Sequence, residues 1–393
     1  MQNHKNGTGR YSQKTGSEKL RSFWKGLGDF SWVIISTVLT VGLIVAMALF
    51  MGTSGSAQQS LVKMAITDKF DMFMTNQISD AAGDLLSIEK VYWLNDDDQV
   101  APEPNPACYG ETDDPSTLGW LLEEAAELLD GQETLFSTET QIMEGSTVRY
   151  YLDETIFAIV WKEAHTNTVY THAEVKIAHP SQLRRFLAGG EYGSEKQFIT
   201  TEMAQSVNAV LASSGDFYRF RSYGIIVYDG QVKRVNGEYV DTCMIDENGD
   251  MHLIYAGQIT DQAAAQKYVD ENNIRFSLAF GPVIIDGGKK VAPYDYTLGE
   301  VHAYFPRAAL CQMGELHYAV VVCNEEGPYK FKPTMGMFAD HIAKMGFDKA
   351  YALDGGQTAV IAMDGELINA VHFGYQREIS DIFYFATAVP DGG

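Results

Sequence analysis

The stretch Tyr351–Asn369 reads YALDGGQTAVIAMDGELIN and contains two Asp-Gly pairs, each after an apolar run. An Asp-Gly pair between alternating hydrophobic residues is typical of a hairpin turn, because glycine accepts the positive φ that the turn requires. Asp364 fits this pattern. Asp354 differs, since Gly-Gly-Gln-Thr follows it and a two-residue hairpin needs no such extension. Adjacent glycines let the backbone approach a ligand and can aim N–H groups at an anion, so Asp354 is the candidate for chemistry.

Short strand-like runs dominate the sequence from about Ser146 onward. They include VRYYL, TIFAIVWK, TVYTHAEVKIA, YGIIVYDGQVKRV, HLIYAG, FSLAFGPVIIDG and AALCQMGELHYAVVVCN. Helical composition interrupts them at KQFITTEMAQSVNAVLASS and TMGMFADHIAKMGF. Strands joined mostly by hairpins, with few helices, predict an α+β domain with mixed, largely antiparallel sheets and flanking helices.

One long apolar segment precedes this domain. Phe30–Gly52 carries no charge over 23 residues, which is long enough to cross a bilayer as a helix. The 29 residues before it hold six Lys/Arg and two acids, a net charge of +4, against −23 for the whole chain. A positive flank inside and an acidic bulk outside is the orientation of a signal anchor. The alternative is a cleaved signal peptide, since small residues lie near Ala57; both interpretations place the C-terminal bulk outside the cytoplasm.

The chain is therefore predicted to have four parts. They are a basic cytoplasmic N-terminus at 1–29, a transmembrane anchor at 30–52, a stalk and accessory helical region at 53–145, and the main domain at 146–393. Within the third part, DPSTLGWLLEEAAELLDGQ predicts a helix that starts at Pro115 and has Gly131 as its C-terminal cap. The expected location is the cell membrane, crossed once.

Charge and cysteine usage exclude some functions. A net charge of −23 and a pI of about 4.7 repel phosphate backbones, so nucleic acid is not an expected partner. The cysteines show no CxxC and no ligand spacing with histidine, and are interpreted as buried or free thiols. They are Cys108, Cys243, Cys311 and Cys323.

Two further segments place a charged side chain at the end of an apolar run. NAVLASSGDFYRF ends its run in Ser214-Gly215-Asp216-Phe217-Tyr218, which sets a carboxylate and two aromatic rings behind a glycine. In AYFPRAALCQ, Arg307 precedes a strand-like run, and a guanidinium can hold a phosphate or carboxylate with two parallel hydrogen bonds. The alternatives are a capped turn for Asp216 and a surface or ion-paired arginine for Arg307.

The order of these segments resembles that of a known family. SGDFY, YGIIVYDGQV, FGPVIIDGG, PRAALCQ and the stretch from TMGMFADHIAKMGF to MDGELIN resemble the phosphodiester glycosidase family, over roughly Ser146–Pro390. There are three departures: Gln357 replaces a third glycine, Ser214 stands where asparagine is common, and AYF replaces the Glu or His that often precedes Pro-Arg. The matched positions are Asp354, Gly355, Gly356 and Thr358 in one loop, Gly215, Asp216, Phe217 and Tyr218 in another, Gly281, Pro282, Pro306 and Arg307 at strand entries, and Asn369 at the final hairpin.

The resemblance implies hydrolysis of a sugar-1-phosphodiester or phosphorylated glycan outside the membrane, with an exopolysaccharide of the cell envelope as a plausible source. Arg307 and the glycine N–H groups would hold the phosphodiester. Asp354 and Asp216 would serve as general base and as stabiliser of an oxocarbenium-like centre, in either order. No cofactor is required, although a divalent cation near the carboxylates is compatible with this chemistry.

The remaining matched positions would line the substrate. Gly215, Phe217, Tyr218, Gln357 and Asn369 are the expected contacts besides the Asp-Gly-Gly loop and Thr358. Two other functions stay open. One is a membrane-anchored binding or assembly module for envelope glycopolymers with a degenerate site, motivated by Gln357 and Ser214. The other is an exo-glycosidase that uses no phosphate.

Overall fold

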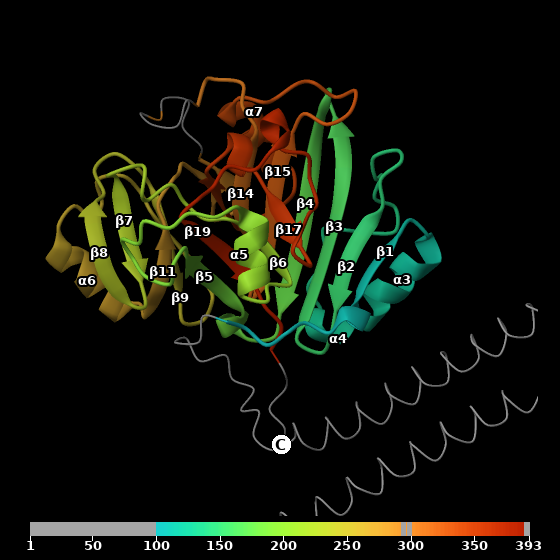
Figure 1. Ribbon diagram of the computed structural model, residues 1–393, viewed down its shortest axis with the longest axis horizontal. Helices are drawn as coiled ribbons and strands as arrows, with labels where there is room; N and C mark the ends of the chain where they lie inside the picture. The colour runs from blue at the N-terminus through green and yellow to red at the C-terminus, as the bar shows by residue number, and fades with distance from the viewer. Residues whose placement is uncertain (1–99, 292–295, 297–300, 389–393) are drawn as a thin grey trace, which may run out of the picture. The chain divides into compact units, whose positions relative to one another are not determined.

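The computed structural model describes residues 100–291, 296 and 301–388 (Figure 1). The predicted cytoplasmic segment 1–29, the predicted anchor 30–52 and residues 53–99 of the predicted stalk lie outside the described residues. Among the residues that are described, none of the helices has the length and apolar character needed to span a bilayer.

A nine-stranded antiparallel sheet is the largest element of the fold (Figure 1). Its order is β1-β2-β3-β4-β15-β14-β16-β12-β13, and every neighbouring pair is antiparallel. The strands span Tyr109–Thr112 (β1), Val148–Leu152 (β2), Ile156–His165 (β3), Thr168–Ile177 (β4), His317–Asn324 (β15), Arg307–Gly314 (β14), Lys349–Leu353 (β16), Val283–Asp286 (β12) and Lys289–Lys290 (β13).

A second, five-stranded antiparallel sheet packs on one face of the first. Its order is β18-β17-β6-β19-β5. One hydrophobic cluster joins Val160 and Val320 of the large sheet to Leu211 and Phe383 of the small one. The strands span Glu366–Leu367 (β18), Ile361–Met363 (β17), Leu211–Ser214 (β6), Asp381–Phe385 (β19) and Leu183–Leu187 (β5).

Helices cover the other face of the nine-stranded sheet, which is why its central strands read as continuous apolar runs. In β3, Ala158 and Val160 face the five-stranded sheet, whereas Phe157, Ile159 and Trp161 pack under the N-terminal helices. These helices are α3 (Pro115–Glu124) and α4 (Ala126–Leu129), and α7 (Met335–Ile342) covers β14, β15 and β16 on the same face.

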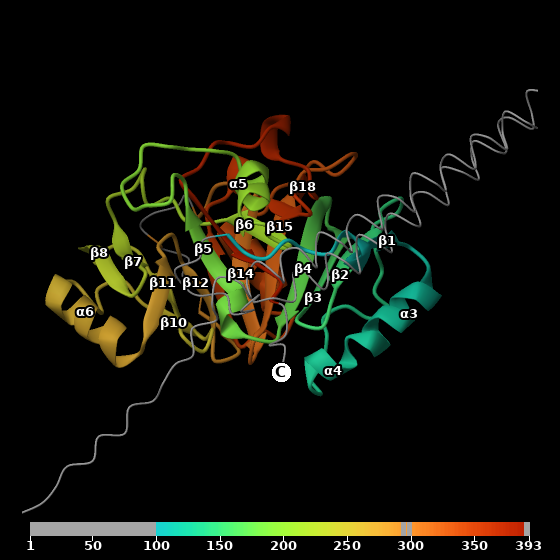
Figure 2. The ribbon, with the colours of Figure 1, turned by 60° about the horizontal axis from the view of Figure 1, so that its bottom comes forward.

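Two smaller sheets and one helix lie at the end of the described domain that is opposite α3 and α4 (Figure 2). The helix α6 (Gln262–Glu271) packs on them through Ala265 and Val269. The two-stranded sheet contains β7 (Gly224–Tyr228) and β8 (Gln231–Asn236), and the three-stranded sheet contains β10 (Met251–Ile254), β9 (Thr242–Asp246) and β11 (Ile274–Leu278).

The predicted sheet-rich α+β class with mainly antiparallel sheets is confirmed, and three details differ. The apolar run after Lys196 was expected to be helical throughout, but α5 covers only Thr200–Ser206. Asn208 then adopts a positive φ of 56°, and the following residues join the five-stranded sheet as β6. The predicted boundary at Ser146 divides one sheet, because β1 pairs with β2.

The third detail is the helix predicted from Pro115. Asp114 caps it by accepting from the N–H of Thr117, and the helix bends near Ala125 into the short α4 before the chain turns at Asp130 and Gly131. All four cysteines are free. Cys311 lies opposite Ala319 and not opposite Cys323, as a hairpin register requires.

Candidate functional site

Asp354 lies where the chain crosses from one sheet to the other. It follows β16 of the nine-stranded sheet, and the next strand, β17, belongs to the five-stranded sheet. The single-turn helix η3 (Gly356–Thr358) makes the crossing. Asp364 and Gly365 instead form the tight turn between β17 and β18, with φ of 53° and 67°. The prediction that Asp364 is a hairpin residue is confirmed, and Asp354 is not part of a hairpin.

The glycines of this crossover pack the loop against the start of β14. The Gly356 N–H donates to the Pro306 carbonyl at 3.1 Å, and a Cβ on Gly355 would lie 2.3 Å from the same oxygen. The Gly355 N–H donates to Oδ1 of Asp354 at 3.0 Å, and the Thr358 hydroxyl donates to the Gly355 carbonyl at 2.7 Å. Both glycine N–H groups therefore have acceptors within the chain, and their predicted contact with a phosphate stays a prediction.

The Asp354 carboxylate is partly accessible, with 14% of its side chain exposed. Its Oδ2 accepts a hydrogen bond from Nη2 of Arg377 and forms an ion pair with it. Burial raises the pKa of Asp354 above its ordinary value. Arg377, the Thr358 hydroxyl and the nearby charge of Arg221 oppose that rise.

Two guanidinium groups contact the same aromatic ring beside Asp354. The Cζ of Arg377 lies 4.8 Å from the ring centroid of Phe217, and that of Arg221 lies 5.7 Å from the same ring and 4.2 Å from Phe280. Phe217 also stacks on Phe220 at 4.7 Å. Cation–π contacts of this kind hold arginines in place without occupying their hydrogen-bond donors.

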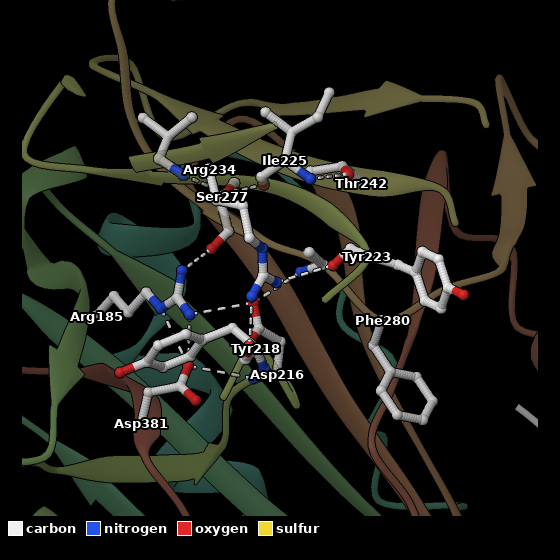
Figure 3. A network of polar contacts seen from close by, with 12 residues as sticks. Arg185, Asp216, Tyr218, Tyr223, Ile225, Arg234, Thr242, Ser277, Phe280 and Asp381 are labelled. Atoms are coloured by element: carbon white, nitrogen blue, oxygen red, sulfur yellow. Dashed lines mark hydrogen bonds and ion pairs between the residues drawn. The ribbon is translucent and has the colours of Figure 1, made fainter. Parts of the chain in front are cut away.

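Asp216 lies in a different environment, a fully buried network centred on Arg185 (Figure 3). Nη2 of Arg185 lies 3.1 Å from Oδ2 of Asp216 and 2.9 Å from Oδ2 of Asp381. The side chains of both aspartates are 0% exposed. The Asp216 carboxylate also accepts from the N–H groups of Tyr218 at 2.6 Å and Ala279 at 2.8 Å.

The same network fixes the backbone on either side of Asp216. Asp381 accepts the Asp216 N–H at 3.1 Å, and a Cβ on Gly215 would lie 1.9 Å from that carboxylate. Burial raises the pKa of Asp381 to about 7; Arg185 opposes the rise and the carboxylate of Asp216 adds to it. Tyr218 is buried over the Arg185 guanidinium at 5.5 Å. Gly215, Asp216 and Tyr218 thus point inward, while Phe217 faces the Asp354 loop.

The other predicted site residues lie around the crossover. Arg307, at the start of β14, is buried and donates from Nη2 to the Ala303 carbonyl at 2.6 Å. Gln357 donates its side-chain amide to the Tyr375 carbonyl at 3.2 Å. The Ser214 hydroxyl donates to the Thr358 carbonyl, which joins the Asp354 loop to the Asp216 loop.

The Asn369 side chain stabilises the final hairpin through hydrogen bonds to the backbone. Its Oδ1 accepts the Ile361 N–H at 2.7 Å, and its Nδ2 donates to the carbonyls of Ala359 and Ala370, each at 2.8 Å. The side-chain amide of Asn369 is therefore bonded to the backbone. No cluster of three or more His, Cys, Asp or Glu within the described parts of the chain is arranged to hold a metal ion.

Sequence reasoning missed Arg377 and Arg221. Arg377 lies 23 positions after Asp354 in the segment HFGYQRE, where the single-turn helix η4 (His372–Gly374) ends before it, so no periodicity marks it. Arg221 lies four residues after Phe217 in DFYRFR, and its clustering with aromatic residues was the only available signal.

Residues 207–386 match the family model of the phosphodiester glycosidases. The resemblance seen in the sequence to this family of glycosidase-type hydrolases is therefore confirmed over that stretch. This stretch contains Asp354, Arg377, Arg221 and Phe217, whereas Arg185 lies before it.

Two solved structures illustrate the similarity. The catalytic domain of zebrafish N-acetylglucosamine-1-phosphodiester alpha-N-acetylglucosaminidase, auto-inhibited by its pro-peptide, is 14% identical, with a TM-score of 0.48, over 66% of this chain and 92% of that one. A hypothetical protein from Synechocystis is 13% identical, with a TM-score of 0.41, over 59% of this chain and 62% of that one. No curated protein matches the sequence.

Proposed function

We propose that this protein is an extracytoplasmic hydrolase that cleaves the glycosidic bond of a sugar-1-phosphodiester and releases the sugar from a phosphorylated glycan. One observation carries the proposal: a partly exposed carboxylate, Asp354, lies beside two arginines that both contact the ring of Phe217. The family match supports the reaction class. A sugar phosphodiester needs these groups together, namely an anion site, an apolar surface and a carboxylate at the anomeric carbon.

We assign the phosphate to Arg377 and Arg221. Guanidinium groups hold phosphate oxygens through pairs of hydrogen bonds, and they stabilise the negative charge that develops as the phosphate leaves. Arg377 is 38% exposed at its side chain, so a ligand can reach it. Arg307 was the candidate from sequence, but its guanidinium is buried and bonded to Ala303, so we rank it second.

We assign the chemical step to Asp354. Water attacks the anomeric carbon, the bond from that carbon to the phosphate oxygen breaks, and the phosphate departs as a monoester. A phosphate leaving group needs little protonation, so one carboxylate acting as base or as charge stabiliser is sufficient. The buried carboxylate of Asp216 would then hold the loop that presents Phe217 and Arg221.

Membrane anchoring through Phe30–Gly52 is part of the proposal. It is supported by the uncharged length of that segment and by the basic flank before it. A reporter that becomes active only outside the cytoplasm should be active when it is fused after Gly393. Protease added to intact cells should degrade this reporter. Protection from the protease would contradict this orientation.

The decisive experiment is an assay of sugar release from an N-acetylglucosamine-1-phosphodiester, with and without a divalent cation. Asp354→Asn is the test variant and Asp364→Asn is the matched control, because Asp364 makes the same Asp-Gly pair in a hairpin turn. Release by the wild type and by Asp364→Asn but not by Asp354→Asn supports the proposal. A folded wild type that releases nothing from a panel of sugar-1-phosphodiesters would overturn it.

A binding or assembly module for envelope glycopolymers is the second candidate. Gln357 motivates it, because this side chain ties the crossover loop to the Tyr375 carbonyl where the family has a flexible glycine. In that case the wild type would show no turnover, and Asp354→Asn would leave the affinity for the glycan unchanged. An exo-glycosidase without phosphate chemistry predicts instead that Arg377→Ala hardly changes the rate.

A further inference from the structure

Four exposed aromatic side chains lie on two loops that border the Asp354 crossover. Tyr304 and Phe305 precede β14, and Phe373 and Tyr375 precede β19. Their exposed fractions are 59%, 36%, 73% and 63%. We call these four residues the aromatic shelf. Exposed aromatic groups on neighbouring loops are typical of ligand-binding or interaction sites.

Hydrogen bonds attach both loops to the crossover. The Pro306 carbonyl, next to Phe305, accepts the Gly356 N–H at 3.1 Å. On the other side, the carbonyl of Tyr375 accepts the amide of Gln357 at 3.2 Å. The shelf is therefore continuous with the loop that carries Asp354.

Ring contacts join the two loops to each other. The imidazole of His372 lies 3.9 Å from the ring of Phe373 and meets Phe305 edge-on at 6.5 Å, measured between ring centroids. Nδ1 of His372 is 2.6 Å from Oε1 of Glu325, and Lys332 lies 3.3 Å from the same oxygen. These charged contacts hold the imidazole in place. Because the imidazole contacts rings of both loops, they also fix the relative position of the two loops.

Phe373 is held in a costly backbone conformation. Its φ of 62° lies in the left-handed region, which a bulky residue rarely adopts. Such a conformation is unfavourable for a bulky residue, and the exposed ring recovers little of that cost by burial. Strain of this kind clusters at ligand clamps, so the observed outlier points to a function for the exposed ring.

We propose that the aromatic shelf binds a saccharide that extends from the phosphodiester, so that the protein prefers an oligosaccharide or polysaccharide over a small substrate. This deepens the proposed function and rests on it. Flat ring faces suit the C–H-rich faces of pyranose sugars, and the Tyr hydroxyls and the His372–Glu325–Lys332 group can bond sugar hydroxyls. The shelf itself contains no aliphatic side chain, unlike a surface built for a membrane or an apolar helix.

The first test measures binding without turnover. Full-length protein is titrated with neutral tetrasaccharides of glucose, mannose and N-acetylglucosamine, which lack any phosphodiester. The expected result is that at least one binds more tightly than its monosaccharide. The double variant Phe373→Asn with Tyr375→Ala should weaken that binding at least tenfold, and Leu367→Ala, another exposed apolar residue, should not. Asparagine is chosen because it accepts the left-handed backbone of Phe373.

The second test compares two substrates with the same reacting group. One is the methyl phosphodiester of N-acetylglucosamine 1-phosphate, and the other carries this phosphodiester on the tetrasaccharide that binds. The ratio of their kcat/KM values should favour the tetrasaccharide at least tenfold and fall at least fivefold in the double variant. Absence of tetrasaccharide binding, or unchanged binding in the double variant, overturns the proposal that the aromatic shelf binds a saccharide. Tetrasaccharide binding without any turnover overturns the proposed function alone.

Discussion

Two arginine–aspartate clusters in this protein use the same chemical groups in opposite surroundings. In the buried cluster, Arg185 is 1% exposed and its partners Asp216 and Asp381 are 0% exposed. In the surface cluster, Asp354 is 14% exposed and Arg377 is 38% exposed. The loop that holds Asp216 and Phe217 takes part in both clusters, yet only the second is open to a ligand.

The difference in burial decides what each ion pair can do. Separating a buried pair leaves a charge without water or partner, which costs about 3–5 kcal/mol. A partly exposed pair is worth about 1 kcal/mol or less, because water replaces the lost partner. The Asp354–Arg377 pair can therefore open when a phosphate arrives, whereas Arg185, Asp216 and Asp381 stay fixed and define the shape of the site.

The comparison is tested most strongly by exchanging carboxylates for amides. Asp354→Asn should lower kcat for sugar-1-phosphodiester hydrolysis by about 10²–10⁴-fold with little change in the unfolding midpoint. Asp216→Asn should lower the midpoint, because Arg185 loses a charged partner inside the protein. Turnover and urea unfolding measured on both variants check this, and a stable but inactive Asp216→Asn would place that carboxylate in the reaction after all.

Removal of the buried arginine should reduce stability. Arg185→Met leaves two aspartates without their cation, so we expect a loss of about 3–5 kcal/mol in the free energy of unfolding. Arg149→Ala is the control, because this arginine pairs with Glu111 and Glu366 at the surface and should cost about 1 kcal/mol or less. Equal losses in the two variants would contradict the distinction between the clusters.

The two phosphate candidates are separated by their own variants. Arg377→Ala should lower kcat/KM by about 10²-fold through lost stabilisation of the leaving phosphate. Arg307→Ala should act less on kcat/KM and more on stability, since its guanidinium is bonded to the Ala303 carbonyl. Kinetics on a phosphodiester and on a phosphate-free aryl glycoside would show whether the loss depends on phosphate. The reverse ranking would return Arg307 to first place.

The smallest expected effect concerns pH. The pKa of Asp381 is about 7 in the folded protein, against about 3.9 for an unfolded aspartate. Between these values the folded state binds the extra proton, so this group stabilises the fold fully below pH 4 and loses that contribution as pH rises through 7. Relative to Asp381→Asn, the wild type should lose stability as the pH rises from about 4 to about 7. A stability difference between the two that stays constant with pH would contradict the raised pKa.

Local patterns were sufficient for much of the fold. Alternating and continuous apolar runs with Asp-Gly turns predicted antiparallel sheets, and the turn at Asp364 is formed as expected. Which sheet a strand joins could not be read in this way. β16 and β17 look like neighbours in a hairpin, but they lie in different sheets, and β6 was hidden within a segment of helical composition.

For the site, the sequence by itself determined that Asp354 differs from the aspartates of the other Asp-Gly pairs. The segment Gly-Gly-Gln-Thr after Asp354 is longer than a two-residue hairpin turn requires. The sequence also marked Phe217 and the acidic character of the chain as starting points for a function. Only the tertiary structure brought Arg377 and Arg221 to Asp354 and buried Asp216 against Arg185. The physical reason is that desolvation and charge pairing depend on distances across the folded chain, which spacing along the sequence does not contain.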